Sequence, residues 1–164
     1  MKKKFSLNFQ KVLFSLALFS LPLIGMAQGK TDFSGTWKLN RSQSKLNAEF
    51  SMSPGQITIN QKGNSLTSVR VSNFEGEEFT QTATYTLDGK DSKNTGFQDT
   101  EIISQASWAS DGTTLQIKTT VPLPDGGNMT INETYKMDGS NLTIENQFEG
   151  PWGESSETWV YVKQ

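Results

Sequence analysis

Histidine and cysteine are both absent from the 164 residues. The chain therefore has no Ser-His or Cys-His nucleophilic pair, no disulfide, and none of the zinc, copper, haem or iron–sulfur sites that these side chains usually hold. Acid–base chemistry near neutral pH would have to use carboxylate, Lys or Tyr groups. We expect no catalytic residues, no metal and no cofactor, and predict that the protein is not an enzyme.

Basic residues are scarce once the N-terminus is set aside. The first 27 residues contain four lysines and no acid, which leaves residues 28–164 with a net charge of about −6. Nucleic-acid binding draws its affinity from a basic face that neutralises phosphates. We expect no nucleic-acid partner.

The sequence has no apolar run long enough to span a bilayer. Val12–Ile24 follows the N-terminal lysines, is interrupted by a proline, and falls short of the ~20 residues that a transmembrane helix needs. Small residues then end at Ala27, a pattern that predicts a signal peptide over residues 1–27. No cysteine stands at the cleavage point to carry a lipid. We expect a mature domain of residues 28–164, periplasmic or secreted, without a membrane span.

Beyond Gln56 apolar and polar residues alternate with a period of two, which is the pattern of half-buried strands. Asp-Gly pairs at 88–89, 111–112, 125–126 and 138–139 separate these runs and favour tight hairpin turns. The stretch Asp88–Thr100 is weaker and predicts a short strand at Lys90–Ser92 followed by a polar loop. The clearer predicted strands are Ile57–Ile59, Leu66–Val71, Phe79–Leu87, Ile102–Trp108, Leu115–Val121, Met129–Met137, Leu142–Phe148 and Thr158–Val162.

Short connections between successive strands favour antiparallel neighbours, and a sheet of this many twisted strands must close or split to avoid exposed edges. We predict an all-β fold, a single antiparallel up-and-down β-barrel of about eight to ten strands, with a two-sheet sandwich as the alternative. Arg41–Gly55 is the one long connection. It predicts either a short lid or helix over the barrel mouth, or a loop that packs Leu46 and Phe50 over an open end.

The first predicted strand carries a Phe-x-Gly-x-Trp-Lys-Leu run within Asp32–Leu39. This run resembles the calycin superfamily, and in particular its bacterial lipocalin-like and fatty-acid-binding-protein-like barrels. The resemblance implies that Gly35 bends the chain into the barrel, that Trp37 plugs the closed end, and that Leu39 is the next inward residue.

Two departures from that pattern bear on the ligand. Fatty-acid-binding proteins hold a carboxylate with an Arg-x-Tyr pair on the final strand, where this chain has Trp159-Val160-Tyr161. The late arginine that stacks on the lipocalin tryptophan is also missing, and Lys163 is the available substitute. A neutral or aromatic ligand, or no small ligand at all, is therefore favoured over a fatty-acid anion.

The candidate ligand-binding residues are inward members of the predicted strands. The tyrosines among them offer an apolar wall with hydroxyls that can orient a guest, and Arg70 is the candidate electrostatic anchor. Two alternatives stay open, namely that side chains fill the barrel and that Arg70 is exposed or paired. The full set is Trp37, Leu39, Arg70, Phe79, Tyr85, Trp108, Tyr135, Trp159 and Tyr161.

These features predict a protein that holds a small hydrophobic or amphipathic ligand inside a barrel. The alternative is a protein-interaction or enzyme-inhibitor module that uses the barrel loops and has a filled core. Trp152 lies in the Gly150–Gly153 hairpin tip and is a candidate contact for a protein partner. The other reading of Trp152 is that it folds back over the barrel rim.

Overall fold

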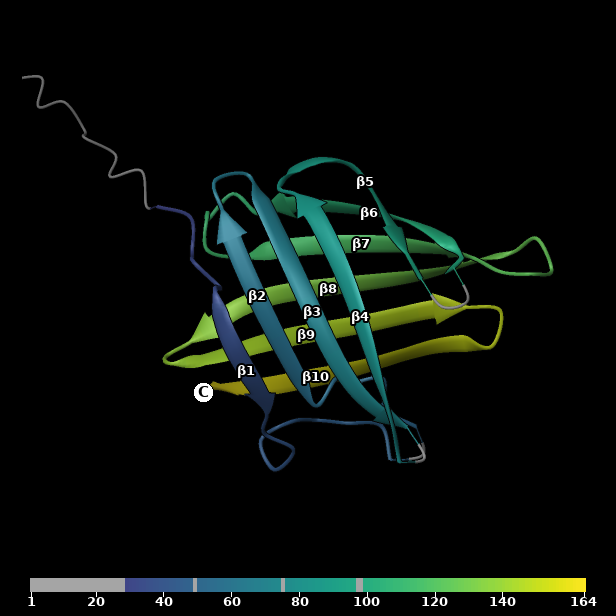
Figure 1. Cartoon of the computed structure of the whole chain (residues 1–164), viewed down its shortest axis with the longest axis horizontal. Helices are drawn as coiled ribbons and strands as arrows, with labels where there is room; N and C mark the ends of the chain where they lie inside the picture. The colour runs from purple at the N-terminus through teal and green to yellow at the C-terminus, as the bar shows by residue number, and fades with distance from the viewer. Residues whose placement is uncertain (1–28, 49, 75, 97–98) are drawn as a thin grey trace, which may run out of the picture.

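Ten antiparallel strands and no α-helix make up the part of the chain that the computed structural model describes, which is residues 29–48, 50–74, 76–96 and 99–164 (Figure 1). Within these ranges no helix is long and apolar enough to cross a bilayer. The strands are β1 (Gly35–Leu39), β2 (Gln56–Lys62), β3 (Ser65–Phe74), β4 (Glu77–Thr86), β5 (Asp88–Thr95), β6 (Glu101–Trp108), β7 (Leu115–Pro122), β8 (Asn128–Asp138), β9 (Asn141–Gly150) and β10 (Gly153–Lys163).

The strands form one sheet in the order β4-β3-β2-β1-β10-β9-β8-β7-β6-β5. The first and last strands are neighbours, because Trp37 of β1 pairs with Lys163 of β10 on one side and with Ile57 of β2 on the other. In Figure 1 strands β2–β4 cross in front of β6–β10, so the sheet wraps around a common interior. The predicted up-and-down barrel is confirmed, and the sandwich alternative is not what forms.

The two ends of this sheet, β4 and β5, meet at a seam without a backbone ladder between them in the described residues. Side chains of β5 bond to the backbone of β4 instead. The Thr84 amide donates to Asn94 Oδ1 at 2.7 Å, Asn94 Nδ2 donates to the Thr84 carbonyl at 3.1 Å, and the Thr86 amide donates to Ser92 Oγ at 3.0 Å. These bonds lie near the turn that joins the two strands. Farther away, residues 77–82 of β4 are exposed on both faces, so the seam opens.

The weak strand expected at Lys90–Ser92 is longer than predicted, because β5 runs from Asp88 to Thr95. Its exposed polar composition hides the alternation, since Ser92 is its one buried residue. The prediction of a polar loop from residue 93 was therefore wrong as far as Thr95.

One end of the barrel is closed by aromatic side chains. Trp37 is 1% exposed and its Nε1 donates to the Phe33 carbonyl at 2.9 Å. Phe33 in turn stacks on Trp108, with ring centroids 5.9 Å apart. Lys163 Nζ lies 5.3 Å from the centroid of the Trp37 ring, as expected for a substitute of the missing arginine. Gly35 has φ +144°, a backbone conformation that residues with a side chain rarely adopt, so this bend favours glycine.

The connection between β1 and β2, residues 40–55, is an irregular segment that we call the strap. The predicted helix does not form, because Asn40 and the serines that follow it bond locally: Ser44 Oγ donates to the Asn40 carbonyl at 2.7 Å and Ser42 Oγ to Asn40 Oδ1 at 2.8 Å. The strap is instead tied to β10, where the Lys45 amide donates to the Thr158 carbonyl at 2.8 Å. Leu46 packs against the core.

The strap marks the second end of the barrel, which we call the open end. Because the strands alternate in direction, the turns between β3 and β4, β5 and β6, β7 and β8, and β9 and β10 all lie at this end. The exposed large hydrophobic residues of the described chain all belong to the strap, to the exposed half of β4 or to the β9–β10 turn. They are Phe50, Met52, Phe79 and Trp152.

Candidate functional site

A charged pair lies inside the barrel. Arg70 of β3 donates from Nη1 to Glu133 Oε1 at 3.0 Å and from Nη2 to Glu133 Oε2 at 2.8 Å, so the guanidinium grips the carboxylate with two parallel bonds. Arg70 Nη2 also donates to the Tyr135 hydroxyl at 2.5 Å. The side chains of Arg70 and Glu133 are 16% and 3% exposed.

Strand alternation brings these groups together. Leu66 and Ser68 are buried, so Arg70 shares their inward face two residues farther along β3. Glu133 and Tyr135 are inward neighbours on β8 for the same reason. Strands β3 and β8 are not adjacent in the sheet, so the pair spans the interior from one wall to another.

The surroundings keep this cluster charged at Arg70 and neutral at the tyrosines. Burial lowers the pKa of Arg70, but the Glu133 carboxylate, with Tyr135 and Tyr85, raises that pKa well above its ordinary value. Burial raises the pKa of Tyr85, Tyr135 and Tyr161, and in each case the charges of Arg70 and Glu133 also act on the hydroxyl. The three hydroxyls therefore stay protonated at physiological pH, and that of Tyr135 is in direct contact with Arg70.

A second buried carboxylate lies toward the strap. Glu157 of β10 is 7% exposed; its Oε2 accepts from Trp159 Nε1 at 2.8 Å, and its Oε1 accepts from the Asn47 amide at 2.6 Å. The Tyr161 hydroxyl donates to the Pro54 carbonyl at 3.0 Å, a second tie between β10 and the strap. The strap is thus fixed to the interior polar groups of β10.

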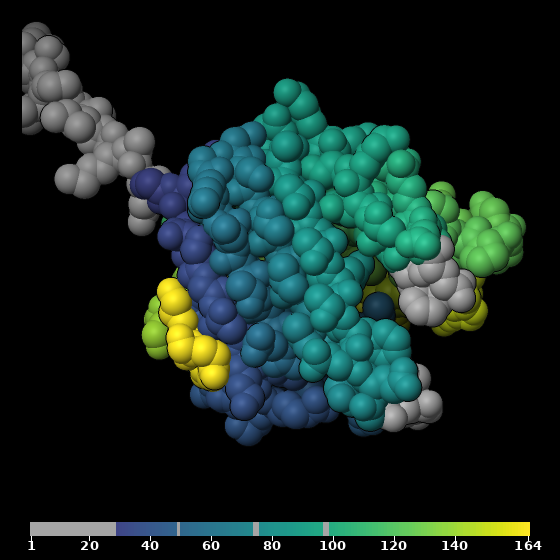
Figure 2. Space-filling view, viewed as in Figure 1, coloured from purple at the N-terminus to yellow at the C-terminus, as the bar shows by residue number. Residues whose placement is uncertain are grey.

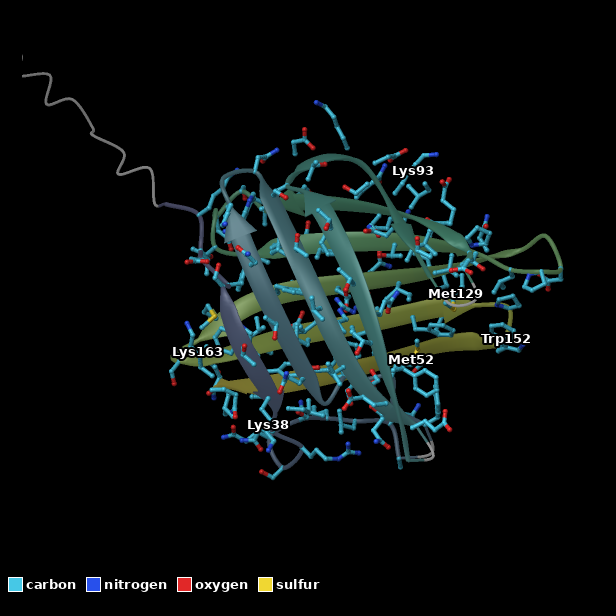
Figure 3. The ribbon with its side chains drawn as sticks, in the orientation of Figure 1. Lys38, Met52, Lys93, Met129, Trp152 and Lys163 are labelled. Atoms are coloured by element: carbon cyan, nitrogen blue, oxygen red, sulfur yellow. The ribbon has the colours of Figure 1, made fainter. Side chains whose placement is uncertain are left out.

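Inward positions between the ion pair and the open end are mainly apolar and only half-buried. They continue the inward faces of β3, β7, β8 and β9 toward this end, and they are Ser72, Val121, Met129, Ile131 and Phe148. Figure 3 shows Met129 and Met52 toward the end of the barrel that carries the Trp152 hairpin. In Figure 2 the surface is hollowed between the β4 strand and the C-terminal strands, in yellow, that lie behind it. We call these inward positions and this hollow the open half of the barrel.

The residues expected to line a ligand site fall into three groups. The structure joins Arg70 to Tyr135 by a hydrogen bond, while Tyr85 and Tyr161 are buried on the interior and the Tyr161 hydroxyl donates to the Pro54 carbonyl of the strap. Trp37 and Trp159 belong to the packed core, as the three tyrosines also do, and Leu39 and Trp108 are partly buried and pack against that core.

Side chains fill the half of the barrel on the side of the closed end, since Phe33, Tyr135, Leu142 and Ile144 are all 0% exposed. Phe79, at 46% exposed, lies on the open part of β4 rather than beside the others.

Sequence reasoning missed three interior polar residues, Glu133, Asn146 and Glu157. Asn146 Nδ2 donates to Glu133 Oε1 at 3.5 Å, which places it at the edge of the Arg70 cluster. The signal was present, because Glu133 has the same strand parity as Tyr135, Asn146 the same as Ile144, and Glu157 the same as Trp159. A polar residue in an inward row of apolar ones indicates an interior partner.

Trp152 is 75% exposed, so it does not fold back over the rim. Two shallow depressions lie on the outer face of the sheet. Their walls are mainly polar, outward-facing side chains, and Asn132 and Gln147 contribute to both. Neither depression resembles the mainly apolar lining of a small-molecule pocket.

No family model matches the chain, and no curated protein matches its sequence significantly. Solved structures do match its fold. Zebrafish ileal bile acid-binding protein, in a crystal structure with cholic acid, aligns with TM-score 0.54 and 15% identity over 80% of this chain and 98% of that one. Fatty-acid-binding protein 1 of Echinococcus granulosus aligns with TM-score 0.52 and 14% identity over 80% of this chain and 96% of that one. The likeness establishes the barrel fold that the Phe-x-Gly-x-Trp run predicted.

Proposed function

We propose that the protein binds a small apolar or amphipathic molecule, without catalysis, in the open half of the barrel. This proposal rests on the order in which polar and apolar side chains follow one another along the barrel interior. A polar floor, formed by Arg70, Glu133 and Tyr135, lies below half-buried apolar side chains that lead to the open end. A few placed polar groups under a mainly apolar wall is the usual composition of a small-molecule site.

The fold supports this assignment. The two solved structures with the same barrel are named for binding bile acids and fatty acids, and one of them holds cholic acid. The proposal carries over the class of guest, an apolar or amphipathic small molecule, and not either named ligand.

Binding can be tested by titrating the protein with long-chain alcohols, sterols and aromatic compounds while following tryptophan fluorescence and the melting temperature. A ligand should raise the melting temperature, because it binds the folded state alone. Ile131→Trp should fill the open half and abolish the response. Asn132→Trp places the same side chain on the outer face of β8 and should leave it intact. No response to any compound would overturn the proposal.

We also propose that the chain is exported to the periplasm or beyond, and that residues 1–27 are removed. These residues lie outside the described part of the structure, and the proposal rests on their lysines, apolar run and small residues. N-terminal sequencing of the protein from a periplasmic or medium fraction should begin at Gln28. Retention of the intact N-terminus in the cytoplasm would contradict export.

One observation favours a second candidate function, binding of a protein partner through the β9–β10 turn. Trp152 exposes 75% of its surface at the tip of that turn, and exposed tryptophan is a frequent anchor of protein interfaces. Trp152→Ala should then abolish association with that partner while small-molecule binding and the melting temperature stay unchanged. Loss of small-molecule binding in this variant would assign Trp152 to the barrel mouth instead.

A further inference from the structure

The barrel interior already contains its own counter-ion for Arg70. Glu133 occupies the position relative to the guanidinium that the carboxylate of a bound acid would take, with both oxygens bonded at 3.0 and 2.8 Å. Of the five N–H groups of an arginine, these bonds and the one to Tyr135 use three. The guanidinium keeps N–H groups that can donate to a neutral oxygen, but the Glu133 carboxylate already balances its positive charge.

The described interior also has an excess of negative charge. Glu133 and Glu157 are both buried, at 4% and 7% exposed, and Arg70 is the one inward-facing base near them in the described residues. Glu157 is bonded to Trp159 and to the strap rather than to a base. A carboxylate brought into this space would lose its hydration and find no unmatched positive charge.

The approach to the interior is acidic as well. Exposed bases at the open end of the described chain are Lys38, Arg41, Lys45 and Lys93, and Lys93 is paired with Glu101 at 3.1 Å. Exposed acids outnumber them at the turns and strand ends there: Glu77, Glu78, Asp99, Glu101, Asp125, Glu149 and Glu154. An anionic ligand that approaches this end would meet mainly like charge, whose effect extends over about a Debye length, ~8 Å at physiological salt.

We infer that the barrel selects an uncharged apolar molecule, such as one with a hydroxyl or carbonyl oxygen, and discriminates against carboxylates of the same shape. The inference rests on the proposed function, because it names the class of guest for that site. Its cause is the Arg70–Glu133 pair, so replacing Glu133 alone should change the preference.

The test compares dodecanol with dodecanoate, which have equal chain lengths, by isothermal titration at about pH 8. Wild type should bind dodecanol at least about tenfold more tightly, the factor that 1.4 kcal/mol gives. Glu133→Gln keeps an amide oxygen for Arg70 but frees its charge. This variant should bind dodecanoate about tenfold more tightly than wild type does and dodecanol within about twofold. Adding Arg70→Gln to it should abolish the gain.

A second measurement needs no variant. As the pH falls through the pKa of dodecanoic acid itself, wild type should bind the acid progressively more tightly, while dodecanol, which does not titrate, controls for changes in the protein. Equal or tighter binding of dodecanoate at about pH 8 would overturn the inference and leave the proposed function standing. Failure of both ligands and of the wider panel to bind would overturn the proposed function, and the inference with it.

Discussion

The Glu133 carboxylate accepts two hydrogen bonds from the Arg70 guanidinium across the interior of the barrel, from a strand that is not a neighbour of its own. This pair joins the two walls of the barrel through side chains rather than through the sheet. Its bonding also fixes the charge that a guest would meet. Stability and ligand preference therefore depend on the same two residues.

Glu133→Ala should destabilise the fold by about 3 kcal/mol, because removing one partner leaves a largely buried guanidinium without its counter-ion. Replacing both partners, with Arg70→Met and Glu133→Leu, should cost less than the single change, since no uncompensated charge remains. Urea denaturation of the three proteins measures the difference. A double variant less stable than Glu133→Ala would show that the pair is not what the single change disrupts.

Trp37→Ala should cost about 3–5 kcal/mol, the range for deleting a large buried aromatic side chain. Trp37 is 1% exposed, and the change would also remove the donor to the Phe33 carbonyl. Trp152→Ala is the matched control, because Trp152 is 75% exposed and its loss should leave thermal stability within about 0.5 kcal/mol of wild type. Equal effects of the two changes would refute the assignment of Trp37 as the plug.

Asn94→Ala should open the seam between β4 and β5. The amide of Thr84 donates to Asn94 Oδ1, so its hydrogen exchange should accelerate, whereas the amide of Thr86 donates to Ser92 Oγ and should change less. Loss of the two Asn94 bonds should cost about 1–2 kcal/mol.

Lys93→Ala, on the same strand but in an exposed ion pair, is the control for this substitution. If Thr84 exchanges at the wild-type rate in Asn94→Ala, another interaction closes the seam.

Asp111 should make stability depend on acid pH. Its pKa is lowered to about 2 by the Thr114 hydroxyl, and then by the amides of Thr114 and Thr113, all of which donate to the carboxylate. A folded-state pKa below the unfolded value means that the stabilisation is present above about pH 4 and is lost as the pH falls through about 2. Wild type should therefore have a higher melting temperature than Asp111→Ala at neutral pH, and this difference should disappear as the pH falls through that range. A difference that is constant from neutral to acid pH would contradict the role of the carboxylate.

The barrel could be predicted from the sequence because the features that indicate it are local. Alternation along each strand and Asp-Gly turns such as Gly89 and Gly139, with φ of +79° and +60°, determine the hairpins. The Phe33–Leu39 run correctly indicated the plug at Trp37. Strand β5 was underestimated because its stability comes from side-chain bonds to β4, which leave no apolar pattern.

The centre of the site was only half predicted. Arg70 was a candidate anchor for a ligand, with an exposed or paired arginine as the alternative, and the structure shows the paired alternative. The partner is Glu133, 63 residues away in the chain, and no local pattern relates the two. Alternation alone could have placed Glu133 inward beside Tyr135, yet the register that brings β8 opposite β3 depends on closure of the whole sheet. The path of the strap likewise depends on long-range hydrogen bonds, such as that from the Asn47 amide to Glu157.

Methyl NMR during a titration with dodecanol tests the central claim most directly, because it reports where a guest lies. Binding in the open half should shift the methyl resonances of Met129 and Ile131, above the Arg70–Glu133 pair, and leave those of Ile57, which is 0% exposed, nearly unchanged. Shifts confined to the outer face or to the Trp152 hairpin, or no shifts at saturating dodecanol, would contradict the account.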